Sequence, residues 1–140
     1  MRLVLLLCAL AVGGCATTLT PTSTATQVPP ERLIAFQAAA SDSGTIVVTR
    51  DVGFIGKGCF NGFMINGELA ARFAAGETAT FHVPSGKLLF RSGSDPQGRG
   101  LCSGGKDNWT QRESWIKPGE TKRFRLTLSS EGQPDIQRAD

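Results

Sequence analysis

The chain has 140 residues, of which 19% are charged, and it contains 17 glycines, two tryptophans and no tyrosine. This length fits one domain with a short additional segment. The formal net charge of +3 is too small to indicate nucleic acid as a partner.

The first fifteen residues have the pattern of a secretory signal. Arg2 supplies a positive start, and the apolar run LVLLLCALAV that follows is too short for a spanning helix, which needs about 20 apolar residues. The next four residues, VGGC, resemble a bacterial lipobox. The resemblance implies removal of residues 1–14 and a lipid on Cys15, which anchors the chain in a membrane. An ordinary signal peptide with a chance cysteine is the alternative.

Residues 15–30 form the lipidated cysteine and a predicted tether. The sequence ATTLTPTSTATQVPP is rich in Thr, Ser and Pro and has no charge, which is typical of disorder. As a flexible coil it would span about 20 Å on average, and about 50 Å fully extended. Ala16 rather than aspartate follows Cys15. By resemblance to enterobacterial sorting rules, this implies the outer membrane. We expect the domain to face the periplasm.

Residues 31–43 are predicted to form a short helix. The sequence ERLIAFQAAA contains helix formers throughout, and the two prolines before it are a plausible helix start. The helix would have only about three turns, so it would need to dock on the domain through Leu33, Ile34 and Phe36.

Residues 44–140 have the pattern of an all-β domain. Strands are expected at residues 45–50, 60–66, 68–73, 78–83, 87–92, 109–116 and 121–129, with a short edge strand near Ile136. Asn66-Gly67 is a strong hairpin signal, because both residues accept positive φ. About seven short strands at intervals of about 10 residues predict an antiparallel β-sandwich or a small barrel, and we expect the sandwich.

The four cysteines are expected to have separate roles. Cys8 lies within the signal and Cys15 carries the lipid, which leaves Cys59 and Cys102 to pair in an exported chain. The disulfide would close a loop of roughly 44 residues and stabilise the domain by about 4 kcal/mol. Two cysteines and one histidine, His82, do not make a zinc site, so we expect no metal and no cofactor.

A long block of the domain resembles a known family. The block MINGELAARFAAGETATFHVPSGKLLFRS and the later WIKPGETKRFRLTL are similar to small proteobacterial lipoproteins with an immunoglobulin-like domain of unknown function, related in its hairpin to the PEGA repeat. The turns at residues 66–67, 76–77 and 84–86 carry the likeness. The resemblance implies an immunoglobulin/transthyretin-like sandwich, and it brings no catalytic residues.

Three basic residues form a possible binding loop. Lys57, Arg99 and Lys106 fall in the two Gly-rich loops, 51–58 and 93–108, that the disulfide would join. Loops on a rigid scaffold often carry function, although a solvated connection is the simpler interpretation. The acidic residues of these loops match no EF-type calcium spacing.

The two tryptophans and the single histidine are the remaining candidates for binding or catalytic residues. Trp109 and Trp115 are six positions apart in one strand and therefore share a face, either in the sandwich core or as a partly exposed platform for glycan or protein. His82 has no partners that would make a catalytic triad. We therefore expect no enzyme activity.

These patterns lead to one functional hypothesis and two alternatives. The first is a non-enzymatic, membrane-anchored lipoprotein whose β-sandwich binds another envelope component. An accessory lipoprotein of a secretion or envelope complex is the second. The third is a periplasmic lysozyme-inhibitor-like protein that inserts a loop near residues 92–94 into the enzyme.

Overall fold

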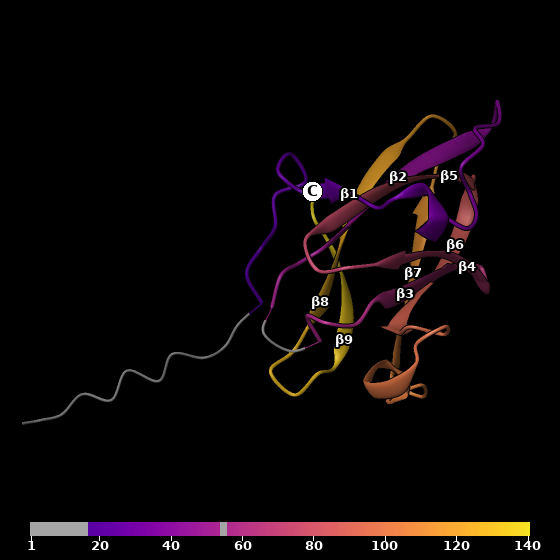
Figure 1. Cartoon of the computed structure of the whole chain (residues 1–140). Helices are drawn as coiled ribbons and strands as arrows, with labels where there is room; N and C mark the ends of the chain where they lie inside the picture. The colour runs from indigo at the N-terminus through magenta and orange to yellow at the C-terminus, as the bar shows by residue number, and fades with distance from the viewer. Residues whose placement is uncertain (1–16, 54–55) are drawn as a thin grey trace, which may run out of the picture.

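The structure is a computed structural model that describes residues 17–53 and 56–140 (Figure 1). The signal peptide at residues 1–14 and the lipid site at Cys15 lie outside the described residues and stay predictions. Two sheets of five and four strands contain about half of the chain, which fits the expected β-sandwich. The short helices of the described part lack the length and apolarity needed to cross a membrane.

The strands are divided between two sheets. The first has the order β1 (Thr26–Gln27), β5 (Glu77–Pro84), β2 (Ser43–Arg50), β8 (Thr121–Leu128) and β9 (Pro134–Arg138). The second has the order β4 (Glu68–Phe73), β3 (Asn61–Ile65), β6 (Gly86–Ser94) and β7 (Trp109–Ile116). Two 3₁₀ helices, η1 (Pro30–Arg32) and η2 (Gly100–Ser103), are the helical elements of the described residues.

The expected strands are present, but their number and pairing differ from the prediction. Each of the seven expected strands begins and ends within two residues of an observed one, and the edge strand near Ile136 is β9. The described residues contain nine strands rather than about seven, because the edge strand β9 adds to the seven and β1 was not expected. The sandwich is not purely antiparallel, since β2 pairs with β8 and β1 with β5 in parallel.

A cluster of phenylalanines fills the space between the sheets. The ring of Phe63 lies 5.6–6.3 Å, centre to centre, from the rings of Phe73, Phe81 and Phe90, and Phe90 packs edge-on against Phe124 at 4.9 Å. Both sheets contribute to this cluster, and its members are buried. The inward-facing positions of the alternating strands therefore form one continuous core.

The predicted helix at residues 31–43 is wrong. After η1 the chain follows the edge strands in an extended form. The amide of Ile34 donates to the carbonyl of Ala70 at 2.8 Å, and the amide of His82 donates to the carbonyl of Phe36 at 2.8 Å. A helix of three turns is marginal by itself. Strand edges that offer unpaired backbone groups are a better source of hydrogen bonds for this segment.

The predicted disorder of residues 16–30 is also wrong over the part that is described. The hydroxyl of Thr17 donates to the carbonyl of Leu128 at 2.6 Å, and Thr18 pairs with Val52 in an isolated bridge. Farther along, β1 pairs with the first residues of β5. The Thr-rich composition predicted little apolar burial, but backbone and hydroxyl groups attach the segment through hydrogen bonds instead.

The eight strands from β2 to β9 cross the sandwich in alternate directions. One end, which we call the disulfide end, is where β2, β4, β6 and β8 finish and where β3, β5, β7 and β9 begin. The opposite or far end holds the turns at residues 66–67, 85 and 117–120. Figure 1 shows the loop at residues 95–108 and the β8–β9 turn on the same side of the molecule.

Candidate functional site at the disulfide end

The disulfide joins two loops that are far apart in the sequence. Cys59 and Cys102 are bonded, as the sequence predicts, and they are 43 positions apart. The bond ties the β2–β3 loop to the β6–β7 loop, which also carries η2. Because both loops follow strands of the rigid sandwich, the disulfide fixes a surface at this end of the domain.

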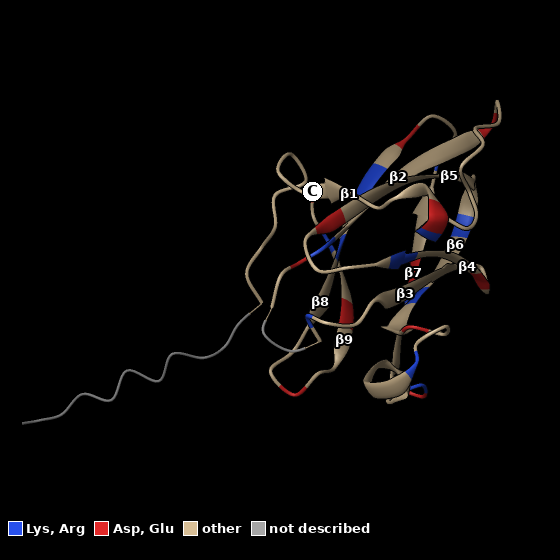
Figure 2. Cartoon of the chain, in the orientation of Figure 1, with Lys and Arg blue, Asp and Glu red and all other residues tan. Residues whose placement is uncertain are grey.

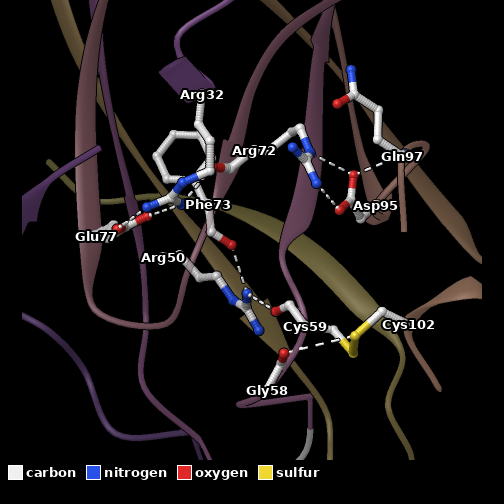
Figure 3. A network of polar contacts seen from close by, with 10 residues as sticks. All are labelled: Arg32, Arg50, Gly58, Cys59, Arg72, Phe73, Glu77, Asp95, Gln97 and Cys102. Atoms are coloured by element: carbon white, nitrogen blue, oxygen red, sulfur yellow. Dashed lines mark hydrogen bonds and ion pairs between the residues drawn. A yellow bond between two sulfur atoms is a disulfide. The ribbon is translucent and has the colours of Figure 1, made fainter. Parts of the chain in front are cut away.

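A buried arginine forms hydrogen bonds with the backbone of the β2–β3 loop. The guanidinium of Arg50 donates to the carbonyls of Cys59 and Phe73, both at 2.7 Å (Figure 3). It also donates to the carbonyl of Gly56 at 2.9 Å. Burial lowers the pKa of Arg50 to about 10, although the charge of Glu77 acts in the opposite direction. Arg50 is therefore engaged with the backbone, and its role is to set the shape of the loop.

A second arginine fixes the start of the β6–β7 loop. Nε and Nη2 of Arg72 donate to the two carboxylate oxygens of Asp95 at 2.8 and 2.6 Å, and the amide of Gln97 donates to the same carboxylate at 2.9 Å (Figure 3). Burial alone would raise the pKa of Asp95. These hydrogen bonds and the charge of Arg72 outweigh burial and hold that pKa below its usual value. A bidentate pair of this kind defines orientation as well as distance.

A third arginine links the N-terminal segment to the same network. Arg32 donates to both oxygens of Glu77, at 2.7 and 2.6 Å, and to the carbonyl of Arg72 at 3.0 Å. The ring of Phe60 lies 4.3 Å from the guanidinium carbon of Arg32 and 5.0 Å from that of Arg72. These cation–π contacts add to the order of the residues next to Cys59.

The structure brings the three predicted loop residues to one end of the domain. Lys57, Arg99 and Lys106 are exposed, and all three lie in loops at the disulfide end. A hollow of about 430 Å³ beside the disulfide is lined in part by Phe60, Arg72 and Arg99. Charges of both signs are interspersed over the described residues (Figure 2), so this end is mixed rather than strongly basic.

The most exposed apolar side chain of this end was missed by the sequence prediction. Leu101, in η2, is fully exposed beside the bonded Cys102. The sequence could have indicated this exposure, because Leu101 is the one large apolar residue in the polar, Gly-rich stretch GSDPQGRGLCSGGKDN. A leucine that an immobilised loop displays to solvent is suited to contact with another apolar surface.

The paired tryptophans lie on the outside of the sandwich. Trp109 and Trp115 share the outer face of β7, so the alternative that placed them in the core is wrong. Nε1 of Trp109 donates to the carbonyl of Lys106 at 2.7 Å, and the guanidinium carbon of Arg91 is 5.3 Å from the Trp109 ring. Trp115 is 66% exposed and lies near the far end.

Two further expectations concern residues 92–94 and His82. Residues 92–94 do not form a loop but end strand β6, and Ser92 is buried. His82 pairs in register with Thr45 toward the far end, so it is remote from the arginine–carboxylate pairs. Within residues 17–53 and 56–140, no three His, Cys, Asp or Glu side chains gather in a way that could hold a metal ion.

Comparisons with protein-family models, with curated proteins and with solved structures find no match for this chain.

Proposed function

We propose that this chain is a non-enzymatic, lipid-anchored module of the bacterial envelope that binds another envelope component. In this proposal Cys15 carries the lipid, and the domain faces the periplasm from the outer membrane. The sandwich would be of the immunoglobulin/transthyretin type found in the small lipoproteins that its sequence resembles. The observation that carries the proposal is Leu101, which is fully exposed on a loop that the disulfide immobilises.

A rigid loop of this kind favours binding. Association is weakened when a loop must become ordered, and a loop that is already ordered avoids that cost. The Arg72–Asp95 pair and the Arg50 hydrogen bonds order both loops from within the domain. The loop can therefore display Leu101 and the nearby cations in one arrangement.

The chemistry of the site also supports binding rather than catalysis. Catalysis by side chains requires a nucleophile or a base, with an orienting group, within reach of one reacting atom. Arg32, Arg50 and Arg72 are instead bonded to carboxylates and carbonyls of the domain itself (Figure 3). His82, which could act as a base, lies toward the other end of the sandwich.

The anchor is tested by the mass of the processed N-terminus and by membrane fractionation of three forms of the full chain. We expect the unaltered protein and Cys8→Ser to be recovered with membranes and to carry a lipid on Cys15. Cys15→Ser should lose both the lipid and membrane association. Cys8→Ser is the matched control, because it changes a cysteine that processing would remove. An unlipidated Cys15 in the unaltered protein would refute the proposal.

The binding partner is tested by crosslinking in living cells, followed by purification and mass spectrometry. An envelope component captured with the unaltered protein and lost with Cys15→Ser would support anchored binding. The secretion-complex alternative predicts that the captured proteins belong to such an apparatus. Capture that is identical with Cys15→Ser would contradict the anchored mechanism.

Leu101 also favours one alternative, inhibition of lysozyme by an inserted loop. The predicted loop at residues 92–94 is part of a strand, so insertion would have to use the loop that contains Leu101. A lysozyme activity assay with the unaltered protein and with Leu101→Asp tests this. Inhibition that Leu101→Asp abolishes would support the alternative, and lack of inhibition would exclude it.

A further inference from the structure

We infer that the disulfide end is the face that this protein lays against the bilayer, so that the component bound by the Leu101 loop is the membrane surface itself. The inference rests on the proposed function, because it takes the lipid on Cys15 as its premise. It adds the orientation of the domain and the identity of the contacting surface.

The first step is the place where the chain joins the domain. Thr17 is bonded to the carbonyl of Leu128, and the amide of Thr18 donates to the carbonyl of Val52 at 2.8 Å. Leu128 is the last residue of β8, and Val52 lies two residues past the end of β2. Both therefore lie at the disulfide end, and the N-terminal segment meets the sandwich there.

The second step is the short distance that remains to the anchor. Cys15 precedes Thr17 by two positions, and two residues of extended chain span at most about 7 Å. Residues 17–27, which composition predicted to be a free tether, are hydrogen-bonded to the domain. They therefore add no length between the domain and the anchor. A lipid on Cys15 would hold the disulfide end directly at the membrane surface.

The third step is the distribution of exposed apolar side chains. Five large apolar residues of the described chain are substantially exposed: Leu19, Ile34, Val52, Leu101 and Trp115. Leu101 belongs to the disulfide end, Val52 is part of the bridge that attaches the N-terminal segment, and Leu19 follows that bridge. One exposed leucine is ordinary. Three such side chains at the end where the N-terminal segment attaches are suited to the interface between headgroups and acyl chains.

The fourth step is the charge of this end. Asp51, Asp95 and Asp135 are each paired with an arginine. The exposed charged residues of these loops that make no ion pair within the described part of the chain are Lys57, Arg99, Lys106, Asp107 and Glu131. Their sum is a single positive charge, so anionic headgroups would attract this end only slightly. Apolar contact, rather than charge, must provide most of the interaction.

The same geometry disfavours a protein partner on this loop. With the anchor within about 7 Å of Thr17, a folded partner would have to fit between the disulfide end and the bilayer. An anchor this short leaves little room there for a folded protein. The bilayer is therefore the occupant that the position of the N-terminal segment favours.

The orientation is tested with nitroxide labels at the two ends of the lipidated full chain. Ser130→Cys places a label in the β8–β9 turn at the disulfide end, and Ser41→Cys places one before β2 at the far end, with the native disulfide kept oxidised. The protein is inserted in vesicles of phosphatidylcholine and phosphatidylglycerol. We expect a water-soluble relaxation agent to reach the label at position 130 several-fold less than the label at position 41.

Two substitutions test the contribution of Leu101. Leu101→Asp should raise the accessibility of the label at position 130 toward that at position 41. Trp115→Asp, which changes an exposed apolar residue near the far end, should leave it unchanged. Circular dichroism of each variant checks that the fold is retained.

The outcomes separate the two proposals. Mass spectrometry of the same samples that finds no lipid on Cys15 refutes the proposed function and the orientation together. A lipidated sample in which the labels at positions 130 and 41 are equally accessible refutes the orientation alone. Loss of a crosslinked protein on Leu101→Asp, with unchanged accessibility at position 130, overturns the lipid contact in favour of a protein partner.

Discussion

The Arg72–Asp95 pair gives a quantitative test of how the disulfide end is held together. Asp95→Asn removes the negative charge and keeps the shape of the side chain. The Asp95 carboxylate is 2% exposed and the Arg72 side chain is 17% exposed, so the variant leaves a largely buried guanidinium without its counter-charge. Breaking a fully buried pair costs about 3–5 kcal/mol. Because Arg72 keeps some water and its contact with Phe60, we expect a loss of about 2–3 kcal/mol.

The sign of the pH dependence follows from the pKa of Asp95. Burial would raise that pKa, but the hydrogen bonds from Arg72 and from the Gln97 amide hold it below the ordinary value. A lowered pKa in the folded state gives stability that is present above the unfolded pKa of about 3.9 and is lost as the pH falls through the folded value. The free energy of unfolding should therefore fall more steeply below about pH 4 in the unaltered protein than in Asp95→Asn.

Urea unfolding of the oxidised protein, followed by far-ultraviolet circular dichroism at neutral and acidic pH, measures both effects. Glu113→Gln is the matched control, because it breaks the Lys87–Glu113 pair, in which both side chains are more than half exposed. That pair should contribute less than about 1 kcal/mol. The reasoning fails if Asp95→Asn destabilises no more than Glu113→Gln, or if its acid profile is parallel to that of the unaltered protein.

Three further predictions concern the remaining parts of the fold. Reduction of the disulfide, which closes a loop of 43 positions, should lower the free energy of unfolding by about 4 kcal/mol in urea titrations, and an unchanged midpoint would contradict this. Gly93→Ala places a methyl group 2.5 Å from the Trp109 ring and should lower the free energy of unfolding by about 1–3 kcal/mol. Gly58→Ala, with no atom within 4 Å of the new methyl group, should cost much less. Equal losses would count against the packing of the Trp109 ring over Gly93. The amide of Val28, which donates to the carbonyl of Thr78 at 2.9 Å, should be protected from hydrogen exchange, and exchange at the rate of an unfolded peptide would show that the N-terminal segment is free.

Local sequence patterns were sufficient to predict most of the strands. In β8, Phe124 and Leu126 alternate with charged residues, and they are buried in the structure while Arg123 is exposed. Asn66 and Gly67 have φ values of 51° and 84°, which is the conformation that makes Asn-Gly a hairpin signal. These features depend only on residues that are close in the sequence, and they can therefore be predicted from local patterns.

Features that depend on distant partners could not be predicted in this way. The segment that contains Leu33 has good helix propensity, yet it bridges to Ala71 on the edge of β4 instead. No local pattern indicates that this edge would be free to receive it. The parallel pairing of β2 with β8 and the attachment of residues 17–27 likewise depend on contacts between segments that are distant in the sequence.

The candidate site was predicted in part. The disulfide and the position of Lys57, Arg99 and Lys106 near it followed from cysteine usage and loop composition. The arginine–carboxylate pairs did not, because Arg72 and Asp95 are 23 positions apart and belong to different strands or loops. Such a pair becomes visible only when the register of the sheet is known.

The pairing of β2 with β8 has a consequence for the time at which this protein can fold. β2 is the middle strand of its sheet, and residues Thr45 to Arg50 find their parallel partners only at Thr121 to Leu126, close to the C-terminal end. A ribosome must therefore synthesise nearly the whole sequence before the first sheet can close. Folds dominated by such distant pairings form slowly, on the order of milliseconds to seconds. The nascent chain therefore cannot close its five-stranded sheet during most of translation, and an unfolded polypeptide is the form that a translocase can thread across a membrane.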